Sequence, residues 1–256
     1  MTTQNRTKIN KLISDWPKGT VYTASHLKKL GYNYDLIRFY KKSRWIAPVG
    51  NGAYKLFNDT VEWYGSIYAL QTQLTLSIHV GGKTALEIRG MSHYLSEKIY
   101  RCFLYGHRGI KLPQWFKNYD WNTKIHFVTT NLFPKSLPDS FSNYPHRDFH
   151  IRISSPERAA MEMLYHVPEE QGFDEAQKIM ENLFTLRPAI VQKLLENCKS
   201  IKVKRLFMYM AEKHTLPWVD DLNLTKVHFG SGERLIVKNG RLDKKYKITV
   251  PKETEL

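Results

Sequence analysis

The chain has few cysteines and no long apolar segment, and both absences narrow what it can be. Only two of its 256 residues are cysteines, Cys102 and Cys198, and they lie far apart. This argues against a disulfide scaffold and fits the reducing environment of a cytoplasm. No apolar run approaches the ~18 residues of a membrane-spanning helix, and the chain begins without the hydrophobic segment of a signal peptide. We therefore expect a cytoplasmic protein that does not enter a membrane.

The sequence also lacks the short motifs of common metal sites and enzymes. It contains no CxxC, no HExxH, no PD…(D/E)xK, no Gly-x-Ser-x-Gly and no His/Cys cluster with zinc spacing. His146-Arg147-Asp148 resembles a kinase catalytic loop, but Ile153 stands where the metal-binding Asn should be. We expect His146 and His150 to be partly exposed residues at a strand edge. We predict no enzymatic activity, no metal and no other cofactor.

One glycine-rich segment, SIHVGGKTALE at residues 77–87, partly matches a phosphate-binding P-loop. A P-loop requires a second glycine five residues before the glycine of Gly-Lys-Thr, and Ser77 occupies that place. The ring of backbone amides that cradles a phosphate would therefore be incomplete. The segment instead predicts a strand, a tight turn at Gly81-Gly82 and a helix from Lys83.

Positive charge is what the chain has in excess. It carries 39 Lys and Arg residues against 24 Asp and Glu, a net charge of +15. Such a charge predicts a polyanionic partner, either nucleic acid or an anionic membrane surface. Residues 1–60 contain 11 basic and 3 acidic residues, a net charge of +8. More than half of the excess therefore lies in less than a quarter of the chain.

Residues 1–60 follow the pattern of a winged helix-turn-helix. Apolar residues at helical spacing predict three helices, at 6–16, 24–30 and 34–43. Thr23 and Asn33 are expected to cap the second and third helices, and Gly31 is expected to end the second in a left-handed conformation. An Asn-Gly turn at residues 50–52 then joins two short strands, which predicts a β-hairpin as the wing. The residues expected to face the core of this domain are Ile9, Leu12, Ile13, Trp16, Ala24, Leu27, Leu30, Leu36, Ile37 and Tyr40.

The third helix is the expected DNA-recognition helix, because the major groove is wide enough for one helix. Arginine pairs well with guanine and asparagine with adenine, whereas phosphate contacts position a protein without specifying sequence. The residues expected to reach base edges are Asn33, Tyr34, Asp35 and Arg38. The residues expected to contact phosphates are Lys41, Lys42, Arg44, Asn51 and Lys55. The alternative is a winged helix used only for protein contacts, and the local charge argues against it.

Residues 61–256 predict a larger α+β domain, because strands come first, helices follow and a hairpin ends the chain. A connecting helix is expected within 61–75. Predicted strands cover 98–106, 124–130 and 149–154. Predicted helices begin at Ser155-Pro156-Glu157 and lie near 172–184, 187–198 and 201–214. The final hairpin, 232–250, is expected to turn at Asn239-Gly240.

The end of the chain offers a second basic surface. The expected exposed residues are Lys202, Lys204, Arg205, Lys213, Lys238, Arg241, Lys244, Lys245 and Lys247. This surface could bind RNA or an acidic protein, or it could simply be a solvated face. The sequence leaves these alternatives open.

Three segments in one order point to a family: GNGAYKL (50–56), HVGGKTALEIRGMSHYL (79–95) and ISSPERAAMEMLY (153–165). Together they resemble the AbiEi antitoxins and transcriptional regulators of type IV toxin–antitoxin systems, and the resemblance covers nearly the whole chain. It implies that the winged helix binds inverted repeats in double-stranded DNA of the chain's own promoter and represses the operon. It also implies that the C-terminal domain counteracts a nucleotidyltransferase toxin, in abortive infection against phage, without a stable complex. The residues that carry over as part of the antitoxin domain, without a defined chemical role, are Gly81, Gly82, Lys83 and Thr84.

Two other functions remain open at this point. A winged-helix regulator could sense a small molecule in its C-terminal domain, which would require an apolar pocket with a few converging polar groups. An enzyme acting on nucleic acid would require clustered carboxylates or a metal site within residues 98–165, and the sequence indicates neither.

Overall fold

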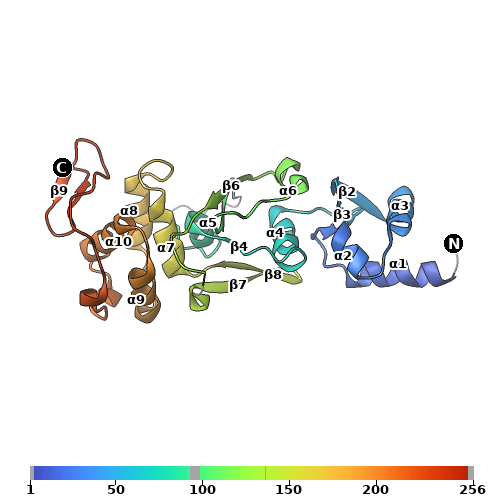
Figure 1. Ribbon diagram of the computed structural model, residues 1–256, viewed down its shortest axis with the longest axis horizontal. Helices are drawn as coiled ribbons and strands as arrows, with labels where there is room; N and C mark the ends of the chain where they lie inside the picture. The colour runs from blue at the N-terminus through green and yellow to red at the C-terminus, as the bar shows by residue number, and fades with distance from the viewer. Residues whose placement is uncertain (1–2, 93–98, 136, 253–256) are drawn as a thin grey trace. The chain divides into compact units, whose positions relative to one another are not determined.

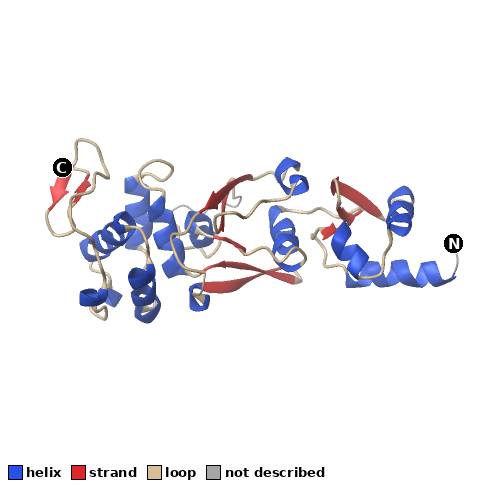
Figure 2. Cartoon of the chain, in the orientation of Figure 1, coloured by secondary structure: helices blue, strands red, loops and turns tan. Residues whose placement is uncertain are grey.

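The computed structural model describes residues 3–92, 99–135 and 137–252 (Figure 1). The chain forms two compact units. The first contains Met1–His79, Gly109–Lys124 and Asn143–Arg152, and the second contains Val80–Arg108, Ile125–Ser142 and Ile153–Leu256. Helices and strands occur together in an α+β fold, as predicted (Figure 2). The prediction that residues 1–60 bind DNA and residues 61–256 act as the antitoxin stays a prediction.

The first unit begins with a winged helix-turn-helix, as the sequence predicts. Its elements are α1 (Thr3–Asp15), β1 (Tyr22–Thr23), α2 (Ala24–Lys29), α3 (Tyr34–Lys42), β2 (Ile46–Gly50) and β3 (Ala53–Leu56). The three strands form an antiparallel sheet in the order β1-β3-β2. Helix α3 packs beside the β2–β3 hairpin, which is the wing (Figure 1).

The predicted helix ends in this unit are confirmed by their hydrogen bonds. The Thr23 hydroxyl oxygen accepts from the backbone amide of His26 at 3.2 Å, and the Asn33 side-chain oxygen accepts from that of Leu36 at 2.9 Å. Gly31 has a φ angle of +87° after α2, in the left-handed region that favours glycine. These local signals therefore determine where α2 and α3 begin and where α2 ends.

The core of the winged helix is close to the predicted one. Its buried members include Ile9, Leu12, Trp16, Leu27, Ile37 and Tyr40, joined by Tyr22, Tyr32 and Ile46. The predicted burial of two residues is wrong, since Ile13 is 36% exposed and Leu30 is 49% exposed. Ile13 lies at the margin of the apolar face of α1. Leu30 is the C-cap of α2, where the helical periodicity that predicted its burial has ended.

Helix α4 (Trp63–Thr72) also belongs to the first unit. The side-chain amide of Gln73 donates to the Val21 carbonyl at 2.6 Å and accepts from the Thr23 amide at 2.8 Å. A Cβ atom on Gly65 would lie 1.8 Å from the Gly19 carbonyl oxygen, so α4 lies directly against the turn before β1. The short helix α6 (Gln114–Asn118), which the sequence analysis missed, completes this unit's helices among the described residues.

A five-stranded sheet has the strand order β6-β5-β4-β8-β7. Its strands are β4 (Ile78–Val80), β5 (Arg101–Gly106), β6 (Lys124–Thr129), β7 (Phe141–His146) and β8 (Phe149–Ser154). Three of them match predicted strands, and β4 matches the strand expected before Gly81. Strand β7 was missed because FSNYPH is polar and contains Pro145; it lies at the sheet edge, where proline is tolerated. His146 lies on this edge strand as expected, and His150 is exposed on β8.

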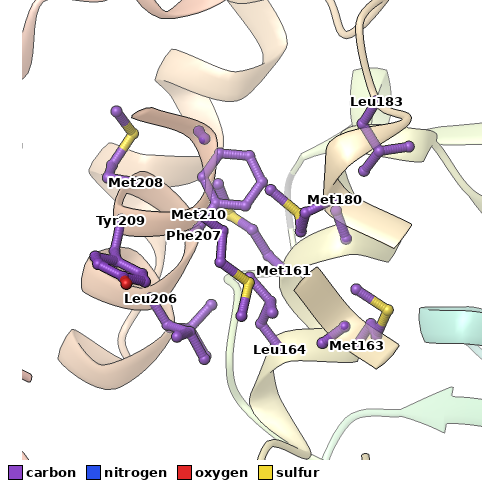
Figure 3. Packing of buried hydrophobic residues seen from close by; sticks show 14 of the residues in the cluster. Met161, Met163, Leu164, Met180, Leu183, Leu206, Phe207, Met208, Tyr209 and Met210 are labelled. Atoms are coloured by element: carbon purple, nitrogen blue, oxygen red, sulfur yellow. The ribbon is translucent and has the colours of Figure 1, made fainter. Parts of the chain in front are cut away.

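Helices dominate the second unit. They are α5 (Gly82–Glu87), α7 (Pro156–Tyr165), α8 (Phe173–Glu181), α9 (Pro188–Asn197) and α10 (Ile201–Lys213), each close to a predicted helix. Every residue of α7 from Glu157 to Leu164 is buried. Met161 and Leu164 of α7 pack with Met180 of α8 and Phe207 of α10 (Figure 3). Helix α7 is therefore the centre of this core.

The final hairpin exists, but its predicted turn is wrong. Strands β9 (Arg241–Asp243) and β10 (Ile248–Val250) pair antiparallel, so the hairpin loop follows Asp243, whereas the turn at Lys238-Asn239, with Asn239 at a φ angle of +59°, comes before β9. The Asp243 carboxylate accepts from the Tyr246 amide at 2.7 Å, which stabilises the hairpin loop. A Cβ atom on Gly240 would lie 2.2 Å from the Val250 carbonyl oxygen, so the glycine allows the backbone at residue 240 to pack closely against Val250.

The predicted exposure of Lys204 and Arg205 on α10 is also wrong. Lys204 is 4% exposed and Arg205 is 2% exposed. The Arg205 guanidinium donates to five backbone carbonyls, at 2.6–3.2 Å. The acceptors are the carbonyls of Phe229, Gly230, Ser231, Gly232 and Lys247. This charge therefore orders the C-terminal segment, and the second basic surface is smaller than predicted.

Candidate nucleic-acid interface

Helix α3 has one buried face and one charged face. Ile37 and Tyr40 are buried in the winged-helix core, 3% and 0% exposed. Arg38, Lys41 and Lys42 are exposed on the same helix. Because residues three and four apart lie on one side of a helix, Arg38, Lys41 and Lys42 form a continuous basic stripe.

The structure leaves eight of the nine predicted DNA-contact side chains accessible. The exposed ones are Asn33, Tyr34, Asp35, Arg38, Lys41, Lys42, Arg44 and Asn51. Lys55 differs, because it is half-buried and its ammonium donates to the Asp59 carbonyl at 2.8 Å. Lys55 would have to give up this bond to contact a phosphate.

Asn33 has two possible uses that compete. Its side-chain oxygen already accepts the Leu36 amide hydrogen as the cap of α3. A bidentate contact with adenine needs the oxygen and the nitrogen of the same amide. While Asn33 caps the helix, only its amide nitrogen is available to donate to a base.

Exposed aromatic rings accompany the basic residues, and the sequence analysis did not single them out. Phe39 on α3 is 41% exposed, Trp45 is 40% exposed and Phe57 is 41% exposed. Arg44, at a φ angle of +57°, places its guanidinium 5.9 Å from the centre of the Phe57 ring. The alternation of aromatic and basic residues in RFYKKSRW was the sequence pattern that could have indicated these exposed rings. Such rings can contact sugars and thymine methyl groups in a groove.

The glycines of the Gly-Gly-Lys-Thr segment allow close packing on Glu162 of α7. A Cβ atom on Gly81 would lie 2.1 Å from the Glu162 Oε2 atom. The Gly82 amide, at a φ angle of +53°, donates to this same oxygen at 3.1 Å. The backbone here therefore binds a buried carboxylate of its own chain. Two of the segments that carry the family resemblance are packed together at this point.

Lys83 and Thr84 have structural partners as well. The Lys83 ammonium lies 3.4 Å from the Glu87 carboxylate and also pairs with Glu175 of α8. Burial alone would lower the pKa of Lys83, but the hydrogen bond to Glu175 and the nearby acidic charges outweigh it and raise the pKa. The Thr84 hydroxyl accepts from the Phe103 amide at 2.9 Å, which joins α5 to β5. His93, Tyr94 and Leu95 of the same predicted motif lie outside the described residues.

Glu162 is the centre of a buried polar network in the second unit. One carboxylate oxygen accepts from the Arg158 guanidinium at 2.7 Å, and the other accepts from the Ser154 hydroxyl at 2.6 Å. Arg158 also donates to the Ser140 hydroxyl at 3.0 Å and lies 4.4 Å from the centre of the Phe141 ring. Each buried charge thus has partners, which is the condition for a stable buried ion pair.

A second polar cluster, absent from the sequence analysis, contains His126 of β6, His166 at the end of α7, and Glu170. Ligand atoms of these three residues lie within 4.8 Å of one another. Burial lowers the pKa of His166, and the Glu170 charge only partly offsets this effect. Arg101 of β5 donates to Glu170 at 2.9 Å. The three residues are 40 and 4 positions apart in sequence, a pattern without any short metal motif.

A winged helix whose third helix exposes a basic face, joined to a second α+β unit, is the architecture of winged-helix transcriptional regulators. Residues 5–97 match the family described as "Transcriptional regulator, AbiEi antitoxin N-terminal domain". Residues 100–251 match "Transcriptional regulator, AbiEi antitoxin, Type IV TA system". The chain belongs to this family of type IV toxin–antitoxin proteins, which are antitoxins and regulators rather than enzymes. The resemblance stated from its three segments is confirmed.

The fold has a solved counterpart. The chain is similar to the RV2827C protein from Mycobacterium tuberculosis, with a TM-score of 0.63 and 14% identity over 97% of this chain and 91% of that one. At this identity the likeness concerns the fold alone. No curated protein sequence matches the chain significantly. Among the described residues, no helix combines the length and the apolarity needed to cross a bilayer.

Proposed function

We propose that this protein represses its own operon by binding inverted repeats in the promoter through α3 and the wing. The observation that supports this most directly is the basic stripe of Arg38, Lys41 and Lys42, exposed on a helix whose opposite face is buried. Arg38 and the N-terminal end of α3 read base edges, and Lys41, Lys42, Arg44 and Asn51 contact phosphates. Membership of a family of transcriptional regulators supports the same function.

The promoter itself provides the test. Fluorescence anisotropy compares the upstream DNA of the gene with a scrambled duplex at ~50 and ~200 mM salt. We expect a preference for the promoter and a log–log salt slope of about −4 to −6, corresponding to roughly five to seven phosphate contacts. Equal affinity for both duplexes would contradict specific repression and leave only a basic protein on a polyanion.

For the second unit we propose that it counteracts a nucleotidyltransferase toxin in the cytoplasm, without forming a stable complex. Family membership supports the antitoxin role, and the identity of the toxin rests on the resemblance. The four residues of the Gly-Gly-Lys-Thr segment contribute by holding α5 against α7, α8 and β5 and not by touching a substrate. A nucleotidyltransferase gene directly downstream would strengthen this assignment.

Co-expression tests the antitoxin role. Cells that express the neighbouring toxin should recover growth when this chain is induced, while size-exclusion chromatography of the two purified proteins should show separate peaks. Failure to restore growth would contradict the antitoxin function. A stable shared peak would contradict only the proposed mode of action.

A further inference from the structure

The cluster of His126, His166 and Glu170 brings three potential metal ligands together from two elements of the second unit. The Nε2 atom of His126 lies 2.9 Å from the Oε2 atom of Glu170, and the Nδ1 atom of His166 lies 3.6 Å from that same oxygen. Two backbone hydrogen bonds hold the turn after α7, from the amides of Glu170 and Gln171 to the His166 carbonyl. Glu170 is therefore fixed close to His166 by the main chain as well.

The hydrogen bonds of Tyr105 are compatible with a tautomer of His166 that can bind a metal ion. The Tyr105 hydroxyl donates to the Glu162 carbonyl at 3.2 Å, and the same hydroxyl lies 3.0 Å from the His166 Nε2 atom. When the single hydroxyl hydrogen points to the Glu162 carbonyl, the hydroxyl oxygen accepts from Nε2–H of His166. In the neutral imidazole of His166, the Nδ1 atom then carries no hydrogen, and its lone pair faces the Oε2 atom of Glu170. The Arg101 guanidinium donates to the same Glu170 oxygen at 2.9 Å, and a metal ion at the site would take over this positive charge.

Two of the three separations between ligand atoms fit a small metal ion, and all three lie within 4.8 Å. With bonds of about 2.0–2.1 Å at tetrahedral angles, nitrogen and oxygen ligands of Zn²⁺ lie about 3.3 Å apart. The distances of 2.9 and 3.6 Å to Glu170 bracket this value. We propose that Nε2 of His126, Nδ1 of His166 and Oε2 of Glu170 form a binding site for a divalent transition metal, Zn²⁺ in the first instance. Two imidazoles and one carboxylate are a donor set that zinc uses, with water in the fourth position.

The neighbours of the cluster adapt to the ion at a modest cost. His126 must move its proton to Nδ1, which lies 3.4 Å from the Arg101 guanidinium. Arg101 is 39% exposed along its side chain, so it can turn away from that atom and stay solvated. Arg101 now donates to the Oε2 atom that would bind the ion, so its guanidinium must move to the other oxygen of Glu170. The Tyr105 hydroxyl orients His166 from behind, as the partner of a metal-bound histidine commonly does. The ion would join β6 to the end of α7.

Metal titration of the full chain tests the site. Protein without a histidine tag is stripped by a chelator and titrated with Zn²⁺ in competition with a chromogenic chelator; Co²⁺ serves as a spectroscopic probe. We expect one Zn²⁺ per chain, and visible d–d bands from Co²⁺ that disappear when Zn²⁺ is added. H126Q, H166Q and E170Q should each weaken Zn²⁺ binding by more than about tenfold, and Y105F by about tenfold.

His146 offers a matched control, because it also lies near one carboxylate, 3.8 Å from Glu62, and the described residues place no third ligand beside this pair. H146Q should bind Zn²⁺ like the unaltered protein. The proposal is overturned if no saturable site of one ion per chain exists, or if E170Q and H126Q leave that site unchanged. The exposed position of Glu170 keeps E170Q informative even if H166Q does not fold, and circular dichroism of each metal-free variant checks the fold. Because the readout is metal binding, its failure leaves the DNA and toxin functions untouched.

Discussion

Arg205 illustrates, at the scale of a single residue, what helical periodicity can and cannot predict. The spacing on α10 places Arg205 among other basic residues and suggests a solvated face. Its five carbonyl acceptors lie 24 to 42 positions later in the chain, in segments with little regular structure. Periodicity compares only neighbours on one helix, so no pattern within 201–214 could reveal these partners.

We expect Arg205→Met to lower the free energy of unfolding by about 3 kcal/mol or more, because it leaves several buried carbonyls without a donor. Lys213→Met on the same helix, where the side chain is exposed, should change it by about 0.5 kcal/mol or less. Urea denaturation followed by circular dichroism measures both. Equal effects of the two substitutions would contradict the role assigned to Arg205.

Single residues of α3 should separate base reading from phosphate contact. Arg38→Ala should cost about 1–3 kcal/mol of operator affinity and relax specificity at one base pair. Lys42→Ala should weaken binding to all sequences alike and reduce the salt slope by about 1. Anisotropy titrations with single-base-pair variants of the operator measure both effects, and Lys178→Ala, an exposed lysine on α8, is the control. If Arg38→Ala retains full preference, the α3 face is not the reading surface.

At the scale of elements, the contact between α5 and α7 gives the P-loop-like segment a structural role. The amide of Gly82 that could face a phosphate faces Glu162 instead. The turn and the helix were predictable from the glycines and from the apolar residues behind them. Glu162 was not, because its position opposite Gly81 depends on how the two helices pack.

We expect Gly81→Ala to destabilise the second unit by about 2–3 kcal/mol, since the new methyl group would displace the Glu162 carboxylate and the Tyr105 ring. Gly172→Ala is a matched control, because no atom lies within 4 Å of its added Cβ atom and its φ angle of −62° suits alanine. Thermal unfolding should separate the two variants clearly. A Gly81→Ala protein as stable as Gly172→Ala would mean that this contact tolerates a side chain.

The start of α7 and the start of α9 are joined by a buried carboxylate. Burial would raise the pKa of Glu157, but hydrogen bonds from the Arg187 side chain and backbone outweigh it and lower the pKa. Its stabilising contribution is therefore present above the ordinary glutamate pKa of about 4.3 and is lost as pH falls through the lowered value.

Glu157→Gln should consequently reduce the free energy of unfolding by about 1–2 kcal/mol at pH 7. The difference from the unaltered protein should shrink as the pH falls below about 4.3. Urea titrations between neutral and acidic pH measure it, with Glu181→Gln on α8 as an exposed control. A difference that is independent of pH would exclude the Glu157 charge as its source.

For the whole molecule, the sequence predicted most helices and the winged helix but only part of the sheet. Long periodic segments and caps such as Asn33 and Ser155 are local signals, and these elements were placed within a few residues. Strand β7 was missed because it is polar and contains Pro145, and helix α6 was missed because it has only five residues. The accessible residues of α3 follow from the same local pattern, whereas the cluster around His166 requires the assembled fold.

The division of labour between the two parts of the chain is also testable. Residues 1–60 contain the whole winged-helix core and should retain operator binding while losing toxin neutralisation. Gel shifts measure the first property and growth rescue the second. A fragment ending at residue 79 should bind the operator and unfold at a higher temperature, because it restores α4 and the Gln73 contacts. Rescue of growth by either fragment would contradict the assignment of neutralisation to the second unit.

Gln73 also has a consequence for exchanging parts between relatives. Its amide forms hydrogen bonds with Val21 and Thr23 much as a neighbouring strand would, although it sits at the end of a helix. A chimaera cut at residue 60 would have to recreate these bonds across a foreign junction. A cut after Ser77, between α4 and β4, would carry them intact without dividing a strand, so we expect operator specificity to be transferred more completely with that junction.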